Sequence, residues 1–210
     1  MKKIIIIATL LIVALTSFTI VKKPNLSDEE KKAIIYLREE EKLARDVYTV
    51  LYDKWNLRVF ENIKVSEQRH MYAMLTLIET YDLQDPVKND ETGKFTNPEI
   101  EAIYKELIHK GLSSETDALL VGATIEDMDI ADLQKAIERT EDDMQKNIYG
   151  ILLQGSENHM RAFARNLQAR ATSYEPVYIS TDEYARIINV SGSGRGMRGV
   201  GMGMQRGRQL

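Results

Sequence analysis

Apolar residues recur at helical spacing in four long segments of this sequence. The segments cover about residues 27–54, 59–81, 114–139 and 140–170. In each, apolar side chains three and four positions apart form one row, which is typical of an amphipathic helix that packs against other helices. Two shorter segments, at about residues 96–110 and 181–188, show the same spacing. No stretch alternates apolar and polar residues as a strand would, so the pattern predicts an all-α protein.

The starts of these segments carry residues that can cap a helix, because their side chains accept hydrogen bonds from the first turn. The predicted caps are Ser27 with Glu30, Ser113 or Ser114 with Asp117, Thr140 with Asp143, and Thr181 or Asp182. Asn56 lies in a short link, so the first two long helices are expected to be antiparallel neighbours. Residues 82–112 make a connection of about thirty residues that contains a short helix ended by Gly111. Such a connection is long enough to run the length of a helical bundle.

Both ends of the chain differ from the middle. Residues 1–21 begin with Lys2 and Lys3 and continue as an apolar stretch, which predicts an export signal. An apolar run of 18 residues can also just span a bilayer, so an uncleaved N-terminal membrane anchor is the alternative. Either one would place the body outside the cytoplasm, with membrane contact through this segment alone. Residues 191–210 are rich in Gly, Arg and Met and have no apolar face to bury, which predicts a disordered tail after one helical domain at residues 22–190.

The charge and the absence of cysteine narrow the classes of function. The chain has a formal net charge of -4, and without the two lysines and four arginines of its ends the body has 22 basic against 32 acidic side chains. A body this acidic is not expected to bind nucleic acid, but it attracts cations. The chain contains no cysteine, which excludes thiolate metal sites, disulfides and cysteine catalysis. Any metal site must therefore use oxygen and nitrogen ligands.

Each of the four long helices places a metal-ligand type of residue in its apolar row. These residues are Glu41 in the first helix, Glu67 and His70 in the second, Glu126 in the third and His159 in the fourth. A lone Glu in such a row is more often a boundary residue, and a lone His is usually satisfied by hydrogen bonds. Burying a carboxylate without a partner costs several kcal/mol, however, and four helices are unlikely to bury a ligand type of residue at similar depth by chance. The set matches the four-helix carboxylate di-metal site, in which two helices each give a Glu and two give Glu-x-x-His.

The residues around these ligands resemble known motifs. Residues 41–48 (Glu-Lys-Leu-Ala-Arg-Asp-Val-Tyr) resemble the Glu-x-x-Ala-x-x-x-Tyr pattern on the first helix of rubrerythrin-like members of the ferritin-like superfamily, and residues 67–70 are similar to their second-helix motif. Residues 122–127 and 155–163 resemble the third and fourth helices of a prokaryotic ferritin-like family, often exported, whose domain has no known function. The resemblance covers about residues 26–188. It implies a metal-binding, ferritin-like four-helix bundle with a long crossover containing a short helix, and a short C-terminal helix.

One position departs from the six-ligand pattern. Ser156 lies three residues before His159, where the pattern has a glutamate that would bridge two metals. Glu157 lies about 100° away around the helix, whereas Asp129 faces the same seam three residues after Glu126 and is the better substitute. The predicted metal ligands are therefore Glu41, Glu67, His70, Glu126 and His159, with Asp129 as the substitute for the absent glutamate. Glu67 is then the one expected bridging carboxylate.

Other side chains near the ligands have less specific roles. Tyr48 shares the row of Glu41 and could hydrogen-bond a ligand, although a packed tyrosine with a satisfied hydroxyl is the more common situation. Arg45, Arg69, Arg161 and Asp46 flank ligand positions and could orient them, with solvated salt bridges as the default for the arginines. Glu39 and Glu40 are expected to face solvent or a polar seam.

The ligand types leave the element and the activity open. Two iron ions are the first expectation, because two Fe(II) could each give an electron to O₂ or peroxide, but Mn and Zn accept the same ligands. The leading hypothesis is an exported di-metal protein that oxidises Fe(II), reduces O₂ or peroxide, or handles metal. The alternatives are a carrier or sensor that holds one tight metal without turnover, and a metal-free extracytoplasmic helical binding module.

Overall fold

Six α-helices and no strands make up residues 26–190, the part of the chain that the computed structural model describes. In chain order the helices are α1 (Asp28–Trp55), α2 (Arg58–Thr80), α3 (Pro98–Gly111), α4 (Glu115–Arg139), α5 (Asp143–Gln168) and α6 (Thr181–Asn189). The all-α prediction is confirmed, and every predicted helix lies close to its expected bounds. No helix in this range is long and apolar enough to cross a membrane. The predicted export signal or anchor and the predicted disordered tail lie outside the described residues.

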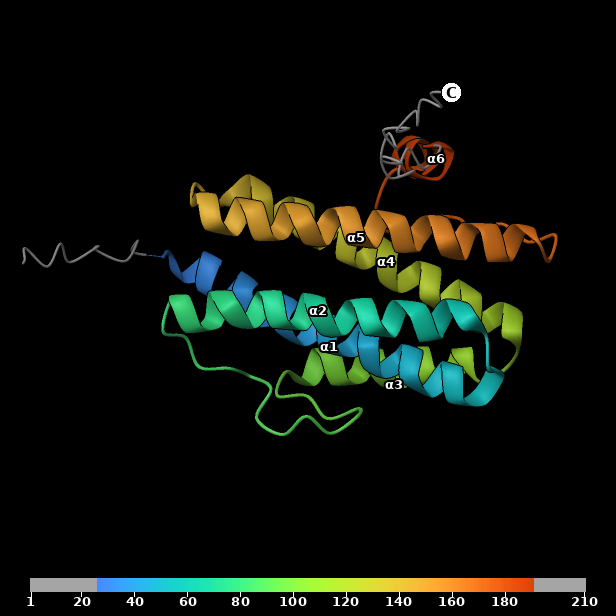
Figure 1. The fold of residues 1–210 in the computed structure, drawn as a ribbon, viewed down its shortest axis with the longest axis horizontal. Coiled ribbons are helices and arrows are strands. Elements are labelled where there is room, and N and C mark those ends of the chain that lie inside the picture. The colour runs from blue at the N-terminus through green and yellow to red at the C-terminus, as the bar shows by residue number, and fades with distance from the viewer. Residues whose placement is uncertain (1–25, 191–210) are drawn as a thin grey trace, which may run out of the picture.

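The four long helices form two hairpins that pack side by side (Figure 1). α1 packs along α2, and α4 packs along α5. α1 also contacts α4, and α2 contacts α5, so each long helix has two long neighbours. Side chains at the middle of the bundle can therefore come from all four helices.

The connection between the hairpins returns the chain to the opposite end of the bundle. In Figure 1, α2 ends on the left and α4 begins on the right, so these two helices run in the same direction. Residues 81–114 make the connection, and α3 within it packs against α1 and α4. α6 packs on α5 after the last long helix. The expected long connection with a short helix is present, as is the short C-terminal helix.

The caps of the helices agree with the sequence at two starts and differ at two. Ser27 forms a full capping box on α1, and Ser114 caps α4. The cap of α5 is Asp142 rather than Thr140: the Asp142 side chain accepts from the Gln145 amide, while the Thr140 hydroxyl accepts from the Asp142 amide and donates to Glu30 of α1. The cap of α6 is Ser180, which precedes the two residues expected from the sequence. The cap of α5 therefore lies two residues later than predicted, and the cap of α6 lies one or two residues earlier.

A polar layer divides the hydrophobic core into two clusters. One cluster contains Tyr48, Phe60 and Phe163, and the other contains Leu37 and Met74. Each large apolar side chain that is buried contributes about 1.5–3 kcal/mol, so the two clusters hold the four helices together. The middle turns between them are the only part of the bundle where all four long helices contribute buried polar side chains, within the described residues.

Candidate metal centre

The polar layer contains every residue that the sequence predicted as a metal ligand. It consists of Glu41 from α1, Glu67 and His70 from α2, Glu126 and Asp129 from α4, and Ser156 and His159 from α5. None of these residues is more than 9% exposed. Each of these residues lies three or four positions from apolar residues on the same face of its helix. It therefore points into the bundle together with them.

Glu41, Glu67 and His70 form the first of two groups in this layer. Nδ1 of His70 lies 2.8 Å from Oε2 of Glu67 and 3.3 Å from Oε2 of Glu41. One ligand atom from each residue lies within 4.8 Å of the other two. Two carboxylates and an imidazole at these separations suit one divalent transition metal.

Glu67, Glu126 and His159 form the second group. Nδ1 of His159 lies 2.8 Å from Oε1 of Glu67 and 3.4 Å from Oε2 of Glu126. Their ligand atoms also lie within 4.8 Å of one another. The rings of His70 and His159 stack with centroids 5.5 Å apart. Glu67 belongs to both groups and turns one oxygen to each histidine, which is the arrangement of a carboxylate that bridges two ions.

Several ligand atoms in the layer are buried without a hydrogen-bond partner. They are Oε1 of Glu41, Oε1 of Glu67, Oδ1 of Asp129 and Nδ1 of His159. Oε1 of Glu67 and Nδ1 of His159 are close to each other, but their directions do not suit a hydrogen bond. Leaving a buried polar atom unpaired costs about 1–3 kcal/mol, and native proteins contain few such atoms. Metal ions in the two groups would satisfy the atoms of Glu41, Glu67 and His159, so these residues fit a metal centre.

The charges in the layer shift the pKa of each member. Burial lowers the pKa of both imidazoles, but Glu41 and Glu67 raise the pKa of His70 to about 12, and Glu67 and Glu126 raise that of His159 to about 10. Burial raises the pKa of Glu67, and the two imidazoles overcome this and lower it to about 2. For Glu41 burial prevails and raises the pKa to about 7. The layer therefore attracts positive charge strongly, and protons on the imidazoles compete with metal for it.

Asp129 and Ser156 meet at the position where the six-ligand pattern has a glutamate. The Ser156 hydroxyl donates to Oδ2 of Asp129, while Oδ1 of Asp129 has no partner. Asp129 lies outside the two three-residue groups. Burial, followed by the charges of Glu41 and Glu40, raises its pKa well above the usual value. Glu157 points away from the layer and pairs with Arg186 at 3.0 Å, which agrees with its place around the helix.

Comparisons with known proteins place this chain in a family. The sequence profile of the family described as "Uncharacterized protein domain (DUF2202)" matches residues 30–191. The chain belongs to the DUF2202 family. It is 55% identical over 175 residues to the uncharacterized protein MJ0754 of Methanocaldococcus jannaschii, which covers 83% of this chain and 94% of that protein. The crystal structure of hypothetical protein MJ0754 from Methanococcus jannaschii DSM 2661 superposes with a TM-score of 0.80 at 54% identity, covering 81% of this chain and 98% of the other.

Tyr48 holds one carboxylate of the candidate metal centre. Its hydroxyl donates to Oε1 of Glu126 at 2.5 Å and lies 3.3 Å from the Gly122 carbonyl. The ring packs against Phe60 and Phe163, which places the aromatic part of one apolar cluster directly behind the carboxylate. Tyr48 is thus a packed tyrosine with a satisfied hydroxyl, and the group that satisfies it is a predicted ligand.

A glycine of α5 makes room for one imidazole of the candidate metal centre. A Cβ added at Gly155 would lie 2.6 Å from both Cε1 and Nε2 of His70. The ring of His70 therefore rests against the α5 backbone, with Nδ1 turned to the carboxylates. At Gly150, five residues earlier on the same helix, an added Cβ would meet nothing within 4 Å. Gly155 therefore faces the His70 ring, whereas Gly150 is exposed and faces open space.

The predicted orienting residues serve other contacts. Arg45 pairs with Asp90 and Asp46, Arg161 hydrogen-bonds Asn158 and the Ile187 carbonyl, and Arg69 is exposed. Asp46 does not orient an imidazole: it accepts hydrogen bonds from Lys42, Arg45 and the Gly93 amide. These groups attach the loop before α3 to α1. Of these residues, Arg45 and Asp46 therefore bind the crossover rather than the predicted ligands.

Three buried carboxylates were not recognised from the sequence. Glu39 and Glu40 do not face solvent, since each is 1% exposed, and Asp127 is fully buried. Glu39 accepts the backbone amides of Thr96 and Asn97 in the crossover, which no periodicity of α1 could indicate. The burial of Glu40 follows from α4 lying beside α1, because Glu40 is next to Glu41 on the flank that α4 covers. Asp127 was visible in the motif of α4, but nothing in its spacing distinguished it from a surface acid.

Proposed function

We propose that this chain is a ferritin-like protein that binds two divalent metal ions, iron foremost, in the layer between its two helical hairpins. The main support is the shared position of Glu67, which gives one oxygen to each of two three-residue groups. The parallel direction of α2 and α4 and the long connection between them agree with the same proposal. Binding of the ions would also be favoured because it would supply partners to buried ligand atoms that have none.

The charge of the layer suits two divalent ions. Glu41, Glu67 and Glu126 supply three negative charges, and Asp129 supplies a fourth when it is ionised. Two divalent ions carry four positive charges, and metal-bound imidazoles are neutral. Asp129 would therefore supply the fourth negative charge, which a glutamate at position 156 provides in the six-ligand pattern.

The ligand types favour a redox-active transition metal without fixing which one. Mixed carboxylate and imidazole ligands suit Fe, Mn and Zn, whereas Mg and Ca prefer oxygen alone. Two bound Fe(II) ions would supply two electrons to O₂ or peroxide. The chain's own residues position these ions: Glu67 joins the two groups, and Tyr48 fixes the orientation of Glu126. The apolar clusters on either side keep bulk water from the layer.

A metal carrier or sensor with one tightly bound ion is the second candidate. Ser156 favours it, because this residue donates a hydrogen bond to Asp129 and offers no charge of its own. One of the two three-residue groups would then hold its ion weakly, because three carboxylates do not neutralise two divalent ions. Stopped-flow mixing of Fe(II)-loaded protein with O₂ or peroxide separates the candidates, since oxidation no faster than in metal-free controls favours carriage.

We also propose that the protein acts outside the cytoplasm. Residues 1–21 combine two lysines with an apolar stretch that is suited to export or anchoring. A fusion of the first thirty or so residues to a reporter that is active only after export tests this, and an inactive reporter with normal expression would overturn it.

Metal titration of the stripped protein tests the metal centre. We expect two ions of Fe(II), under anaerobic conditions, or of Zn(II) per chain by calorimetry, and no binding in the Glu67→Ala/His70→Ala variant. His109→Ala is the matched control, because His109 is the third histidine of the chain and lies exposed on α3. Absence of Fe(II), Mn(II) and Zn(II) uptake by the folded unmodified protein would overturn the proposal.

A further inference from the structure

The two histidines are the members of the candidate metal centre that reach the surface of the protein. The side chains of His70 and His159 are 9% and 11% exposed, whereas the three carboxylates of the two groups are 1–2% exposed. Nδ1 of each ring faces the carboxylates. Nε2 of each ring is neither enclosed nor hydrogen-bonded to any group in residues 26–190. One imidazole ring is therefore all that separates each carboxylate group from solvent on this side.

No hydrogen bond fixes the outer edge of either ring. A histidine that holds a metal usually donates its second ring N–H to a carboxylate or a backbone carbonyl, and this contact sets the orientation of the ring. The described part of the chain supplies no such acceptor to His70 or His159. The rings are oriented by the carboxylates on their inner side and by stacking on each other. Each ring can therefore turn outward about its side-chain bonds without breaking a contact to an outer partner.

Small residues flank His70 along α2. Ser66 lies four residues before His70 and Ala73 lies three residues after it, so all three share one side of the helix. Ser66 and Ala73 are both half-buried. The surface beside the His70 ring is thus made of the two shortest side chains of α2.

The same arrangement recurs around His159 on α5. Gly155 lies four residues before His159 and Ala162 lies three residues after it, and both are half-buried. α2 and α5 are neighbours on one side of the bundle (Figure 1), and Gly155 lies against the His70 ring, so the two rows meet. We call this boundary the α2–α5 seam, which consists of Ser66, His70, Ala73, Gly155, His159 and Ala162.

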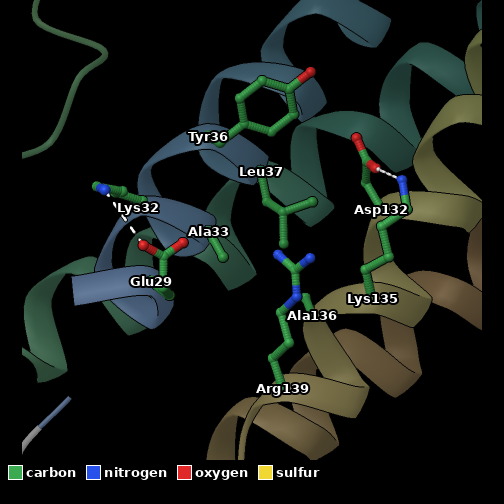
Figure 2. Close-up of a pocket in the computed structure, with 9 residues that line it drawn as sticks. All are labelled: Glu29, Lys32, Ala33, Tyr36, Leu37, Asp132, Lys135, Ala136 and Arg139. Atoms are coloured by element: carbon green, nitrogen blue, oxygen red, sulfur yellow. Dashed lines mark hydrogen bonds and ion pairs between the residues drawn. The ribbon is translucent and has the colours of Figure 1, made fainter. Parts of the chain in front are cut away.

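The opposite side of the bundle is closed to the centre. A groove of about 270 Å³ lies there between α1 and α4, and its wall includes Leu37 and the ion pair of Asp132 with Lys135 (Figure 2). None of the predicted ligands lines this groove. Glu41 and Glu126, which come from α1 and α4, are 1% and 2% exposed. An ion that approaches from this side meets packed helices rather than a ligand.

We propose that the centre exchanges its divalent ions with solution through the α2–α5 seam, with the rings of His70 and His159 as movable covers. This inference rests on the proposed function, and it adds the route by which the ions arrive and leave. The inner carboxylates keep their places when a ring turns, since Tyr48 holds Glu126 from behind. An opening the size of one imidazole ring admits a partly hydrated ion and excludes bulky organic molecules.

Zinc release to a chelator tests the route. Protein loaded with Zn²⁺ is mixed with excess 4-(2-pyridylazo)resorcinol, and the colour of the complex reports the rate of release. We expect Ala162→Leu to slow release by about tenfold or more, because the ring must displace the added side chain before it can turn. Two ions should remain bound at equilibrium. Ala164→Leu is the matched control, because Ala164 is half-buried on the same helix but lies about 200° away around it.

The opposite substitution covers the case in which leucine disturbs packing. Ala162→Gly should release zinc faster than Ala164→Gly, since both lose the same helix preference but only the first lies beside a ring. Ala73→Leu repeats the test at His70. Helix content by circular dichroism confirms that each variant is folded.

The outcomes distinguish the route from the centre. Two bound ions with equal release rates in the variants at residues 162 and 164 would overturn the route and leave the centre intact. Absence of zinc uptake by the folded unmodified protein would overturn the proposed centre, and the route with it.

Discussion

The two faces of α4 treat buried carboxylates in opposite ways. On the outer face, Asp127 accepts hydrogen bonds from the Tyr174 hydroxyl and from the backbone amides of Val177, Tyr178 and Ile179. On the inner face, Asp129 has one oxygen without any partner. Both side chains are buried, and they lie only two residues apart.

This difference separates a structural role from a binding role. Asp127 is saturated by donors of the chain itself, so it fastens the segment before α6 to the bundle. The inner carboxylates Glu41, Glu67 and Asp129 each keep one oxygen without a donor, so part of their negative charge remains available to an ion. What satisfies a buried charge is therefore more informative about its role than the burial itself.

The largest effect is expected from Asp127→Asn. The change removes a buried charge that four donors hold and turns an amide group toward backbone N–H groups, so unfolding in denaturant should show a loss of about 3 kcal/mol. The metal stoichiometry of the folded variant should not change. A variant of normal stability that has lost metal would reverse the roles assigned to the two faces. Glu40→Gln serves as the comparison, because it removes an unsatisfied charge and should leave stability unchanged or higher.

A pH dependence of metal binding is expected next in size. The pKa values of His70 and His159 are raised to about 12 and about 10, so both rings carry protons at neutral pH and must release them to bind metal. Affinity for the pair of ions should therefore rise by up to about 100-fold per pH unit between pH 6 and 8. Calorimetry in two buffers of different ionisation enthalpy counts the released protons. Release of no protons would contradict the assignment of the imidazoles as ligands.

The same shifts affect stability in the presence of a chelator. Because the folded-state pKa of each imidazole lies above its usual value of 6.5, the stabilisation is fully present below about pH 6.5 and is lost as the pH rises toward 10 to 12. Chelated protein should therefore unfold more easily at pH 10 than at pH 7, and added Zn²⁺ should reduce this loss.

A smaller effect is expected from Gly155→Ala. The added methyl group would meet the His70 ring at 2.6 Å and displace it from the carboxylates, so metal affinity should fall by about tenfold or more. Gly150→Ala on the same helix is the matched control. It should leave affinity unchanged and raise stability by up to about 1 kcal/mol, because alanine favours the helix. Equal affinities of the two variants would show that the ring has room to move.

Much of the fold could be predicted because the helices are long and strongly periodic. The ligand positions followed from the same periodicity, since Glu67 and His70 share the row of Met74 and Ile78 and are carried inward with them. The pairing of Glu67 with His159 could be expected only from the resemblance, because sequence spacing does not say which helices become neighbours.

What could not be predicted depends on contacts between distant segments. Glu39 is buried because the crossover returns to α1, and Glu40 is buried because α4 covers its flank. Similarly, Asp127 becomes structural only when residues 174–179 arrive on α4. A helical pattern describes one helix at a time, so it marks an acid beside the apolar row as a surface residue.

The shared position of Glu67 also bears on the order of assembly. The first group comes entirely from the α1–α2 hairpin, and its members His70 and Glu41 are 29 residues apart. Contacts this local form early, because closing a short loop loses little chain entropy. The second group exists only after α4 and α5 have docked. A metal ion captured by the first hairpin would hold Glu67 in place with its other oxygen turned toward the incoming His159, and so act as a template for the docking of the second hairpin.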